Sequence, residues 1–470
     1  MSVDVSVVVV GAGPAGLTLA HELALGGAEV VVVERLAERL EQTKGGAIQP
    51  RTAELLDARG LLDAVLERAN ARPSVGGHFA GLPVELDCTP WNTRNPYVIG
   101  IPQWRVEEVL EEAATARGAQ VLRGHEVTAV EQDDTGVTVT TSATTLRAEY
   151  VVACDGAHST VRKLLDRPFP GRSGTFKAVL ADLRLSAVSD LVPATAGHMS
   201  TLTREVENYW GMLVPAGGDK YRFTFGKLDE VTTPESDEAI QQALTALYGE
   251  PTTLAEVLVR SRFGDSTRQL EQYRHGRVLF AGDAAHIHSP LGGQGLNLGV
   301  QDAINLGWKL AATIAGWAPE GLLDTYHDER HPKAARVLHH TSAQRVLAAP
   351  KPSEDVRALR EIFADVMRLP DTNRVLAGMM SGLDHETRVP DFDLVTDDGP
   401  TRLAELLRAG RGVLVDLTGS VELPEQWADR VDLVRGKASE DFDAILIRPD
   451  GAECWRGEGP LEDALRATFG

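Results

Sequence analysis

The start of the chain alternates between apolar runs and a helical repeat of apolar positions. Residues 5–10 are almost all valine, which is typical of a strand buried on both faces of a sheet. Apolar residues then recur at helical intervals from Leu17 to Ala24, and a second valine run covers residues 30–33 and stops at Glu34. The pattern predicts a strand–helix–strand unit, so we expect an α/β fold.

Hydrophobic spacing predicts further elements of both kinds downstream. Apolar residues from Val106 to Ala113 mark an amphipathic helix, and a second helix is expected over residues 300–314. The acidic residues of the first helix are expected to face largely away from its apolar side: Glu107, Glu108, Glu111 and Glu112. Strands are expected over residues 127–130, 137–141, 150–153 and 277–281.

Two stretches, residues 76–100 and 172–275, are richer in short β-like runs, such as those over residues 209–214 and 221–225. They predict a separate β-sheet domain that interrupts the α/β part. The predicted division is a discontinuous α/β domain over 1–75, 101–171 and 276–390, a β-sheet domain over 76–100 and 172–275, and a C-terminal domain over 391–470.

The C-terminal domain follows a polar linker and has its own α/β pattern. We expect a helix over Thr401–Arg408 and strands over Gly412–Leu417 and Ala444–Arg448. No CxxC motif occurs anywhere in the chain, so disulfide exchange is not expected of this domain.

Composition excludes several classes of protein. The formal net charge of −21 argues against broad binding to nucleic acid or to an anionic membrane. Three scattered cysteines predict neither a disulfide scaffold nor a zinc site. The N-terminus lacks the basic segment of a signal peptide, and glycines interrupt the first apolar stretch, so the sequence predicts a cytoplasmic enzyme.

The turn after the first strand has the spacing of a dinucleotide-binding motif. Gly11, Gly13 and Gly16 follow the strand as GxGxxG, and Glu34 ends the second strand. Such glycines permit a tight turn and close approach of a pyrophosphate, while the helix N-terminus supplies N–H groups. A carboxylate at Glu34 can bind an adenosine ribose and would repel a 2′-phosphate, so FAD or NAD(H) fits better than NADP(H).

A second chemical signal lies at the end of the strand predicted over 277–281. Gly282 and Asp283 follow it, where ligands of open α/β sheets bind, so the carboxylate could hold a ribityl hydroxyl. Asp283 could equally be a helix N-cap or turn residue. A glycine-rich loop then leads to Leu296 and Asn297, where a helix N-terminus would stabilise the negative charge of a reduced flavin.

With Asp155–Gly156 and the following residues to Arg162, these segments resemble the GxGxxG, DG and GD fingerprints of the group A flavoprotein monooxygenases. The likeness is nearest to aromatic polyketide hydroxylases such as those of angucycline biosynthesis. Supporting stretches are Gly77–Pro83, Thr267–Arg274, His286–Asn297 and Ile445–Gly451. The resemblance implies a Rossmann-like FAD-binding domain of the p-hydroxybenzoate hydroxylase type, a β-rich substrate domain and a thioredoxin-like C-terminal domain.

The resemblance also implies roles for matching positions. Glu34 and Arg35 would bind the adenosine side of FAD, Gln103 the ribityl or phosphate region, and Val127 the adenine through its backbone. The DG segment is linked in the family to FAD and NADPH, although Arg162 could instead be a surface cation. Relatives often carry arginine where this chain has Lys44, which puts one bidentate contact in doubt. The expected cofactor-binding residues are Gly11, Gly13, Pro14, Ala15, Gly16, Glu34, Arg35, Lys44, Gln103, Val127, Asp155, Asp283, Pro290, Gly293, Gly295, Leu296 and Asn297.

The expected activity is an FAD- and NADPH-dependent hydroxylation of a polycyclic aromatic polyketide through a flavin C4a-hydroperoxide. FAD would be non-covalent, NADPH transient and O2 the cosubstrate. No side chain is required as acid or base. The residues that would support oxygen transfer lie in the loop over residues 286–297, which we call the flavin loop: Pro290, Gly293, Leu296 and Asn297. Baeyer–Villiger insertion, simple-phenol hydroxylation and a non-catalytic flavin- or polyketide-binding role stay open, as does a homodimer.

Aromatic and sulfur-containing residues could line the substrate pocket, although each could equally belong to the core of the β domain. These candidates are His78, Phe79, Trp91, Tyr209, Trp210 and Met212. His286 and His288 lie in the flavin loop without companion ligands, so no metal site is expected.

Overall fold

The central sheet joins segments that are far apart in the sequence. The computed structural model describes residues 4–41, 45–69 and 77–470. The sheet has eight strands; the main path runs β18-β19-β10-β1-β2-β7, and β9 and β8 extend it from β10. Their bounds are β1 Val5–Val10, β2 Val30–Glu34, β7 Gln120–Arg123, β8 Val127–Asp133, β9 Gly136–Thr141, β10 Thr145–Ala153, β18 Arg274–His275 and β19 Val278–Phe280. β1 pairs in parallel with both β2 and β10, so the motif at its carboxyl end lies beside those that follow β10 and β19.

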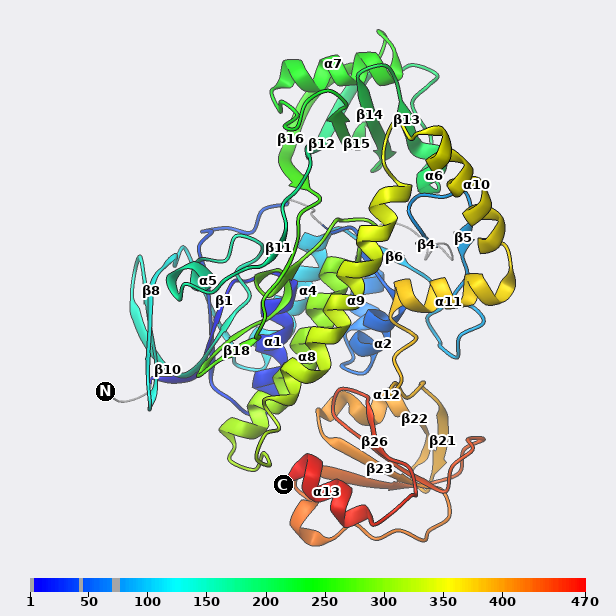
Figure 1. Cartoon of the computed structure of the whole chain (residues 1–470). Helices are drawn as coiled ribbons and strands as arrows, with labels where there is room; N and C mark the ends of the chain where they lie inside the picture. The colour runs from blue at the N-terminus through cyan, green and yellow to red at the C-terminus, as the bar shows by residue number, and fades with distance from the viewer. Residues whose placement is uncertain (1–3, 42–44, 70–76) are drawn as a thin grey trace.

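Long helices pack against this sheet and against one another. α1 (Pro14–Leu25) contacts both α4 (Gln103–Ala116) and α8 (Gln294–Ile314), and α8 also packs against α9 (Thr325–Leu347) (Figure 1). Shorter helices are α2 (Pro50–Asp57), α3 (Leu62–Glu67) and α5 (Thr160–Leu164). Valines of β1 and β2 and leucines of α1 form the largest buried cluster, as the apolar runs predicted.

A second sheet, antiparallel throughout, forms the β-rich part. Its order is β13-β14-β15-β12-β16, and α7 (Asp237–Tyr248) covers its outer face (Figure 1). The strands are β12 Lys177–Ala187, β13 Thr203–Glu205, β14 Tyr209–Pro215, β15 Lys220–Lys227 and β16 Thr253–Gly264. Phe223, Phe225 and Tyr248 fill the space between this sheet and α7.

Small sheets and further helices accompany the two large sheets. One three-stranded sheet consists of β11 (Gly171–Arg172), β17 (Thr267–Gln269) and β20 (His286–Ile287). Two paired segments are β3 (Ala47–Ile48) with β6 (Ile99–Gly100), and β4 (Gly77–His78) with β5 (Glu85–Leu86). The helices here are α6 (Met199–Leu202), α10 (Glu354–Met367) and α11 (Pro370–Ser381).

The C-terminal part has a thioredoxin-like strand arrangement. Its sheet order is β24-β23-β25-β26, with β23–β24 parallel and the other pairs antiparallel, and α13 (Leu461–Phe469) follows. The strands are β23 Gly412–Asp416, β24 Val431–Arg435, β25 Ala444–Ile447 and β26 Glu453–Trp455. Where a helix usually follows the first strand, buried Asp416 instead accepts N–H bonds from the loop, including those of Gly419 and Val421.

One detail of the sequence predictions is wrong. The helix expected over Thr401–Arg408 begins only at Leu403 and continues after Leu406 as a 3-10 turn over Leu407–Ala409, because residues up to Arg402 form β22 (Gly399–Arg402), which pairs with β21 (Asp393–Thr396). None of the four glutamates belongs to the buried side of α4, although Glu107 has little exposed surface and Glu111 pairs with Arg39 and Arg123. The predicted domain limits stay predictions.

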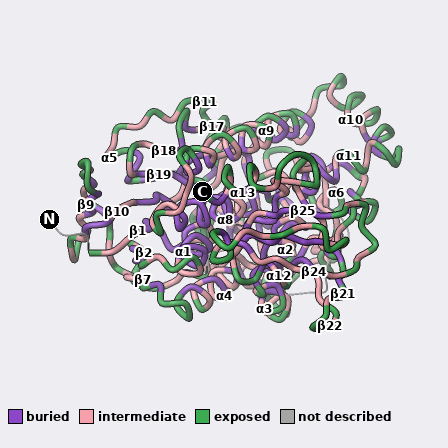
Figure 2. The backbone as a smooth tube through the Cα atoms, turned by 90° about the horizontal axis from the view of Figure 1, so that it is seen from below, coloured by how far each residue is buried: buried purple, intermediate pink, exposed green. Residues whose placement is uncertain are grey.

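Burial follows the layers of the fold. Figure 2 shows buried backbone concentrated along the sheet strands and α8, with exposed turns around the periphery. Among the described residues, no helix is long and apolar enough to cross a membrane.

Candidate functional site

The three glycines of the first turn have different surroundings. Gly11 has a φ of +106°, and a Cβ there would lie 2.5 Å from the Cys154 carbonyl oxygen. A Cβ on Gly16 would lie 2.0 Å from the Gly11 carbonyl oxygen. A Cβ on Gly13, by contrast, would meet no protein atom within 4 Å. Gly11 and Gly16 therefore serve close packing, whereas Gly13 presents backbone that a ligand can approach.

Close packing brings the first turn against the other two motifs. The tight approach of Gly11 to Cys154 places it beside the DG segment. A Cβ on Gly282, of the GD segment, would lie 3.1 Å from the Ala15 Cβ, and one on Gly299 of α8 would lie 3.3 Å from it. Segments around residues 11–16, 154–155 and 282–299 thus lie against one another, and their use as one cofactor site stays a prediction.

Glu34, the residue expected to bind the adenosine ribose, is fixed by two backbone N–H groups. Its Oε2 accepts a hydrogen bond from the Ala12 N–H at 2.9 Å, and its Oε1 accepts one from the Leu36 N–H at 2.9 Å. The carboxylate is thereby held at the end of β2, beside the glycine turn. Arg35 is exposed next to it, and Val127 is buried at the start of β8. Lys44 lies outside the described residues.

Gln103, the first residue of α4, binds the glycine that adjoins the start of α8. Its Oε1 accepts from the Gly45 N–H at 2.9 Å, and its Nε2 donates to Glu107 at 2.8 Å. A Cβ on Gly45 would lie 3.2 Å from Leu296, so Gln103 and the start of α8 meet around this glycine. Burial raises the pKa of Glu107 to about 6. No pattern in the sequence indicated this partner, because Glu107 is one of several glutamates expected away from the apolar side of the helix.

The DG segment is held by side chains that the structure buries. Asp155 Oδ2 caps α5 by accepting from the N–H groups of Thr160 and Val161, at 2.6 and 3.1 Å. Its other oxygen is buried without a hydrogen-bond partner in the described chain, and burial raises the pKa of this carboxyl. Arg162 is also buried, so reading it as a surface cation is wrong: it donates to the Ala284 carbonyl at 2.9 Å and links the DG and GD segments.

Asp283 is exposed one residue beyond Gly282, near the carboxyl end of β19. A Cβ on Gly295 would lie 3.7 Å from its Oδ1 and 3.7 Å from His288 Nε2, so it faces the start of α8. Asp283 is not a helix cap, because it lies inside the short 3-10 turn at Gly282–Ala284, which has no side-chain cap. This placement leaves the carboxylate available to a ligand hydroxyl.

The turn at Gly282 rests on a buried charged network that sequence reasoning missed. Asp302 of α8 accepts from His286 Nε2 at 2.6 Å, from Arg330 Nε at 2.7 Å and from the Gly282 N–H at 3.2 Å. Burial alone would raise the pKa of Asp302, but Arg330 and His286 hold it below its usual value. A lone aspartate among the apolar positions of the predicted helix was the available signal. Within the described residues no cluster could hold a metal ion.

The flavin loop is tied to β3 through Asn297. Its Oδ1 accepts from the Gln49 N–H at 2.8 Å, and its Nδ2 donates to the carbonyls of Ala47 and Gly293 at 3.0 Å each. The side chain is therefore committed to the protein. Gly293, with φ +63°, is the N-cap of α8, and Pro290 is exposed in the loop.

The six proposed substrate residues do not form one group. Trp210 and Met212 share a face of β14, whereas Tyr209 packs with the cluster beneath α7, because alternate side chains of a strand point to opposite faces. Phe79 stacks on Phe363 of α10. The remaining two also have protein contacts: Trp91 donates to the Arg374 carbonyl, and His78 meets the edge of His198.

These features fit FAD: an approachable glycine turn, a carboxylate at each end, and a helix N-terminus beside a glycine-rich loop. Family models agree, one described as an FAD binding domain over residues 4–341 and one as the C-terminal domain of aromatic-ring hydroxylases over residues 386–470. The chain belongs to the FAD-dependent aromatic monooxygenases.

Relatives of this monooxygenase match over nearly its whole length. A 12-dehydrotetracycline 5-monooxygenase/anhydrotetracycline 6-monooxygenase of Streptomyces rimosus is 44% identical, covering 99% of this chain and 98% of that protein. The solved structure of CabE, an aromatic hydroxylase from angucycline biosynthesis, is 38% identical with a TM-score of 0.88, covering 99% of each chain. The Diels-Alderase PyrE3 of pyrroindomycin biosynthesis is 36% identical with a TM-score of 0.87, also over 99% of each chain.

Proposed function

We propose that this monooxygenase uses NADPH and O2 to hydroxylate a polycyclic aromatic polyketide. The observation that carries the proposal is the continuous site formed by the glycine turn, the DG segment and the GD segment. Its support comes from tetracycline- and angucycline-type relatives that match the chain from end to end. Bound FAD would supply reduction by NADPH and transfer of one oxygen atom of O2.

The chain itself would bind, orient and shield. Gly13 and the N–H groups at the start of α1 would face the pyrophosphate, Glu34 the adenosine ribose and Asp283 the ribityl hydroxyls. The N-terminus of α8, with Leu296 and the Asn297 backbone, would stabilise negative charge on the reduced ring. We further propose that Trp210 and Met212, on the face of β14 away from α7, contact the substrate.

The test combines reduction kinetics with isotope labelling. Stopped-flow absorbance should show slow flavin reduction by NADPH alone and faster reduction when a polycyclic phenol, such as an anhydrotetracycline- or angucyclinone-type compound, is present. Mass spectrometry after turnover under 18O2 should find one labelled oxygen in the product. Fast, substrate-independent reduction, or a product without label, would overturn the proposal.

Product analysis in the same reaction separates the remaining alternatives. A new ring hydroxyl supports hydroxylation, whereas a lactone or ester would indicate Baeyer–Villiger insertion. The likeness to a Diels-Alderase makes a third outcome specific: conversion of a substrate to an isomer, with no NADPH consumed and no oxygen gained. Yellow FAD released by acid precipitation would support non-covalent binding.

A further inference from the structure

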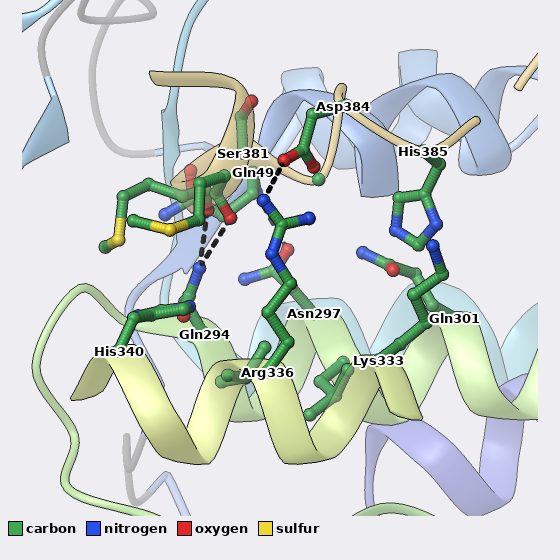
Figure 3. Close-up of a pocket in the computed structure, with 15 residues that line it drawn as sticks. Gln49, Gln294, Asn297, Gln301, Lys333, Arg336, His340, Ser381, Asp384 and His385 are labelled. Atoms are coloured by element: carbon green, nitrogen blue, oxygen red, sulfur yellow. Dashed lines mark hydrogen bonds and ion pairs between the residues drawn. The ribbon is translucent and has the colours of Figure 1, made fainter. Parts of the chain in front are cut away.

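A narrow polar cleft lies beside the flavin loop, on another side of α8 from Ala15 and Gly282. The space between its lining residues is about 480 Å³, which includes the part that opens to solvent. Figure 3 shows polar side chains from α8 and α9 turned toward one another across it, below the segment that follows α11. The polar residues of the two helices are Gln294, Asn297, Gln301, Lys333, Arg336 and His340.

Two side chains of this lining are 5% exposed and have polar atoms without partners in the described chain, His340 Nε2 and Gln294 Oε1. The protonation of His340 follows from its neighbour. Gln344 Oε1 accepts from the Ala80 N–H, so its Nε2 donates to His340 Nδ1 at 3.2 Å. His340 Nε2 therefore carries the hydrogen and is an unused donor. Gln294 Nε2 donates to the Met380 carbonyl at 2.8 Å, which leaves Oε1 as an unused acceptor.

The cleft carries more positive than negative charge. Lys333 has no ion pair or hydrogen bond among the described residues, while Arg336 donates to Asp384 at 2.6 Å through one nitrogen. Burial, and then the charges of Arg330, Arg51, Lys333 and Arg336, lower the pKa of His385 to about 2. Burial, and then His288 and Arg336, lower the pKa of His340 to about 4, so it is neutral near pH 7.

Two further cations near the cleft have carboxylate partners of their own. Arg330 pairs with Asp302, and Arg51 pairs with Glu54, which Arg388 shares. The charge open to a ligand is thus that of Lys333 and Arg336, offset only by Asp384, which Arg336 already engages. Donors converge from α9, and an acceptor faces them from α8, which suits a tetrahedral oxyanion that keeps one proton.

We propose that this cleft binds a phosphate group. The Lys333 ammonium, the free nitrogens of Arg336 and the His340 Nε2–H would donate to its oxygens, and Gln294 Oε1 would accept from a protonated oxygen. The group could belong to free phosphate or to the reductant; the second case rests on the proposed function, in which NADPH brings phosphates near the flavin.

The cleft is connected to the flavin loop by shared residues. Gln49 and Asn297 line it and bond to each other, and Gln49 Nε2 donates to the Gly292 carbonyl at 3.1 Å. A phosphate held at Lys333 would therefore lie against the side chains that fix this loop. Glu34 repels a 2′-phosphate at the glycine turn, so a phosphate of the reductant needs a different place on the protein.

The first experiment measures binding without using activity. Inorganic phosphate is titrated calorimetrically into the FAD-loaded enzyme at constant ionic strength, comparing the wild type with Lys333→Met. Lys220→Met is the control, because it removes an equal charge from an exposed position of β15. We expect about a tenfold or larger loss of affinity in Lys333→Met, as for a charged hydrogen bond, and none in the control. Equal phosphate binding by the wild type and Lys333→Met, or none by either, means the cleft holds water only and overturns the proposal.

A second experiment identifies the source of the phosphate. Flavin reduction is followed at increasing NADPH concentrations in the same variants, with dithionite reduction as the reference. If the reductant supplies the group, Lys333→Met should raise the half-saturating NADPH concentration about tenfold, inorganic phosphate should compete with NADPH, and dithionite reduction should not change. Unchanged NADPH kinetics, together with phosphate binding that is lost in Lys333→Met, establishes a free-phosphate site instead. Because calorimetry needs no turnover, the phosphate titration still tests this site if the monooxygenase proposal fails.

Discussion

Gly13 and Gly16 lie in one turn, yet a side chain would meet different surroundings at each. The Gly16 position faces the Gly11 carbonyl at 2.0 Å, whereas the Gly13 position is open to any group above the turn. Gly13 also has extended backbone, with φ −82° and ψ 180°, which any residue can adopt. The two positions therefore separate a requirement of the fold from a requirement of the cofactor.

Gly13→Val should yield folded protein with little FAD, because its methyl groups would occupy the pyrophosphate's approach. Gly16→Ala should instead lower the free energy of unfolding by about 1–3 kcal/mol or more, through overpacking against backbone. The measurements are the flavin-to-protein ratio and chemical denaturation of both variants. A normal FAD content in Gly13→Val would rule out the turn as the pyrophosphate site.

Asp283→Ala should weaken FAD without disturbing the fold. A hydrogen bond from a ligand hydroxyl to this exposed carboxylate is worth about 1–2 kcal/mol, so the FAD dissociation constant should rise about 5- to 30-fold. Fluorescence titration of the apoprotein gives the constant, and Asp398→Ala, in the exposed turn after β21, is the control. An unchanged constant would make Asp283 a structural turn residue.

Glu107 should make stability depend on pH. Burial raises its pKa from 4.5 to about 6, so the folded state holds the proton more tightly than the unfolded state. The stabilisation is complete below about pH 4.5 and is lost as the pH rises through 6, a change of about 2 kcal/mol. Glu107→Gln should remove this dependence and should be more stable than the wild type at pH 7.5. Chemical denaturation of both proteins between about pH 4.5 and 7.5 measures the difference. Glu108→Gln is the control, and parallel pH profiles for Glu107→Gln and wild type would contradict the assignment.

At the scale of elements, α8 connects three parts of the molecule. Its first turn adjoins the flavin loop, Asp302 in its middle holds the Gly282 turn, and Lys309 near its end reaches Glu329 of α9. Lys309 is fully buried, and burial lowers its pKa to about 8. The sequence of this helix predicts one apolar stripe, but the structure also buries the polar residues Asp302 and Lys309. Each of these residues binds another element of the fold.

Asp302→Asn should destabilise the protein and weaken FAD together. The substitution keeps the shape but leaves the Arg330 guanidinium buried without its counter-charge, which costs about 3–5 kcal/mol. It also weakens the hydrogen bond that the side chain of residue 302 accepts from the Gly282 N–H, so the FAD dissociation constant should rise. Denaturation and flavin titration test both effects against Asp328→Asn, an exposed position of α9. Wild-type stability would show that the network is dispensable.

At the scale of the whole molecule, buried ion pairs join the C-terminal domain to the helices. Arg448 donates to Glu329 of α9 at 2.7 Å and to Asp450 at 2.6 Å, and Asn305 of α8 donates to Asp450 at 2.9 Å. Arg59 donates to the Pro449 carbonyl at 2.8 Å. The long segment after α9 thus brings the C-terminal domain back against α8 and α9 (Figure 1).

Arg448→Met should separate the unfolding of the two parts. Asp450 would lose its paired cation while buried, and Glu329 would keep only Lys309, at a cost of about 3–5 kcal/mol, so the calorimetric transition should fall in temperature and broaden or split. Arg456→Met removes an exposed pair and should cost under about 1 kcal/mol. A single unshifted transition in Arg448→Met would show that apolar packing alone joins the domain.

The sequence by itself determined those features that local geometry requires. The turn of residues 11–16 needs glycines wherever backbone meets backbone, and continuous valine runs fit only strands buried on both faces, so motif, strands and order along the chain could all be predicted. Fold class and family followed from the same short segments.

Only the tertiary structure decided which side chains the fold buries together. Arg162 reaches the Ala284 carbonyl and Asn297 reaches Gln49 across separations that no local pattern records. Likewise, alternation along β14 defines two faces but not which one α7 covers, so the sequence could not decide which of Tyr209 and Trp210 belongs to the core and which faces the other side. The physical reason is that backbone turns are specified by neighbouring residues, whereas burial and partner choice depend on elements brought together from the rest of the chain.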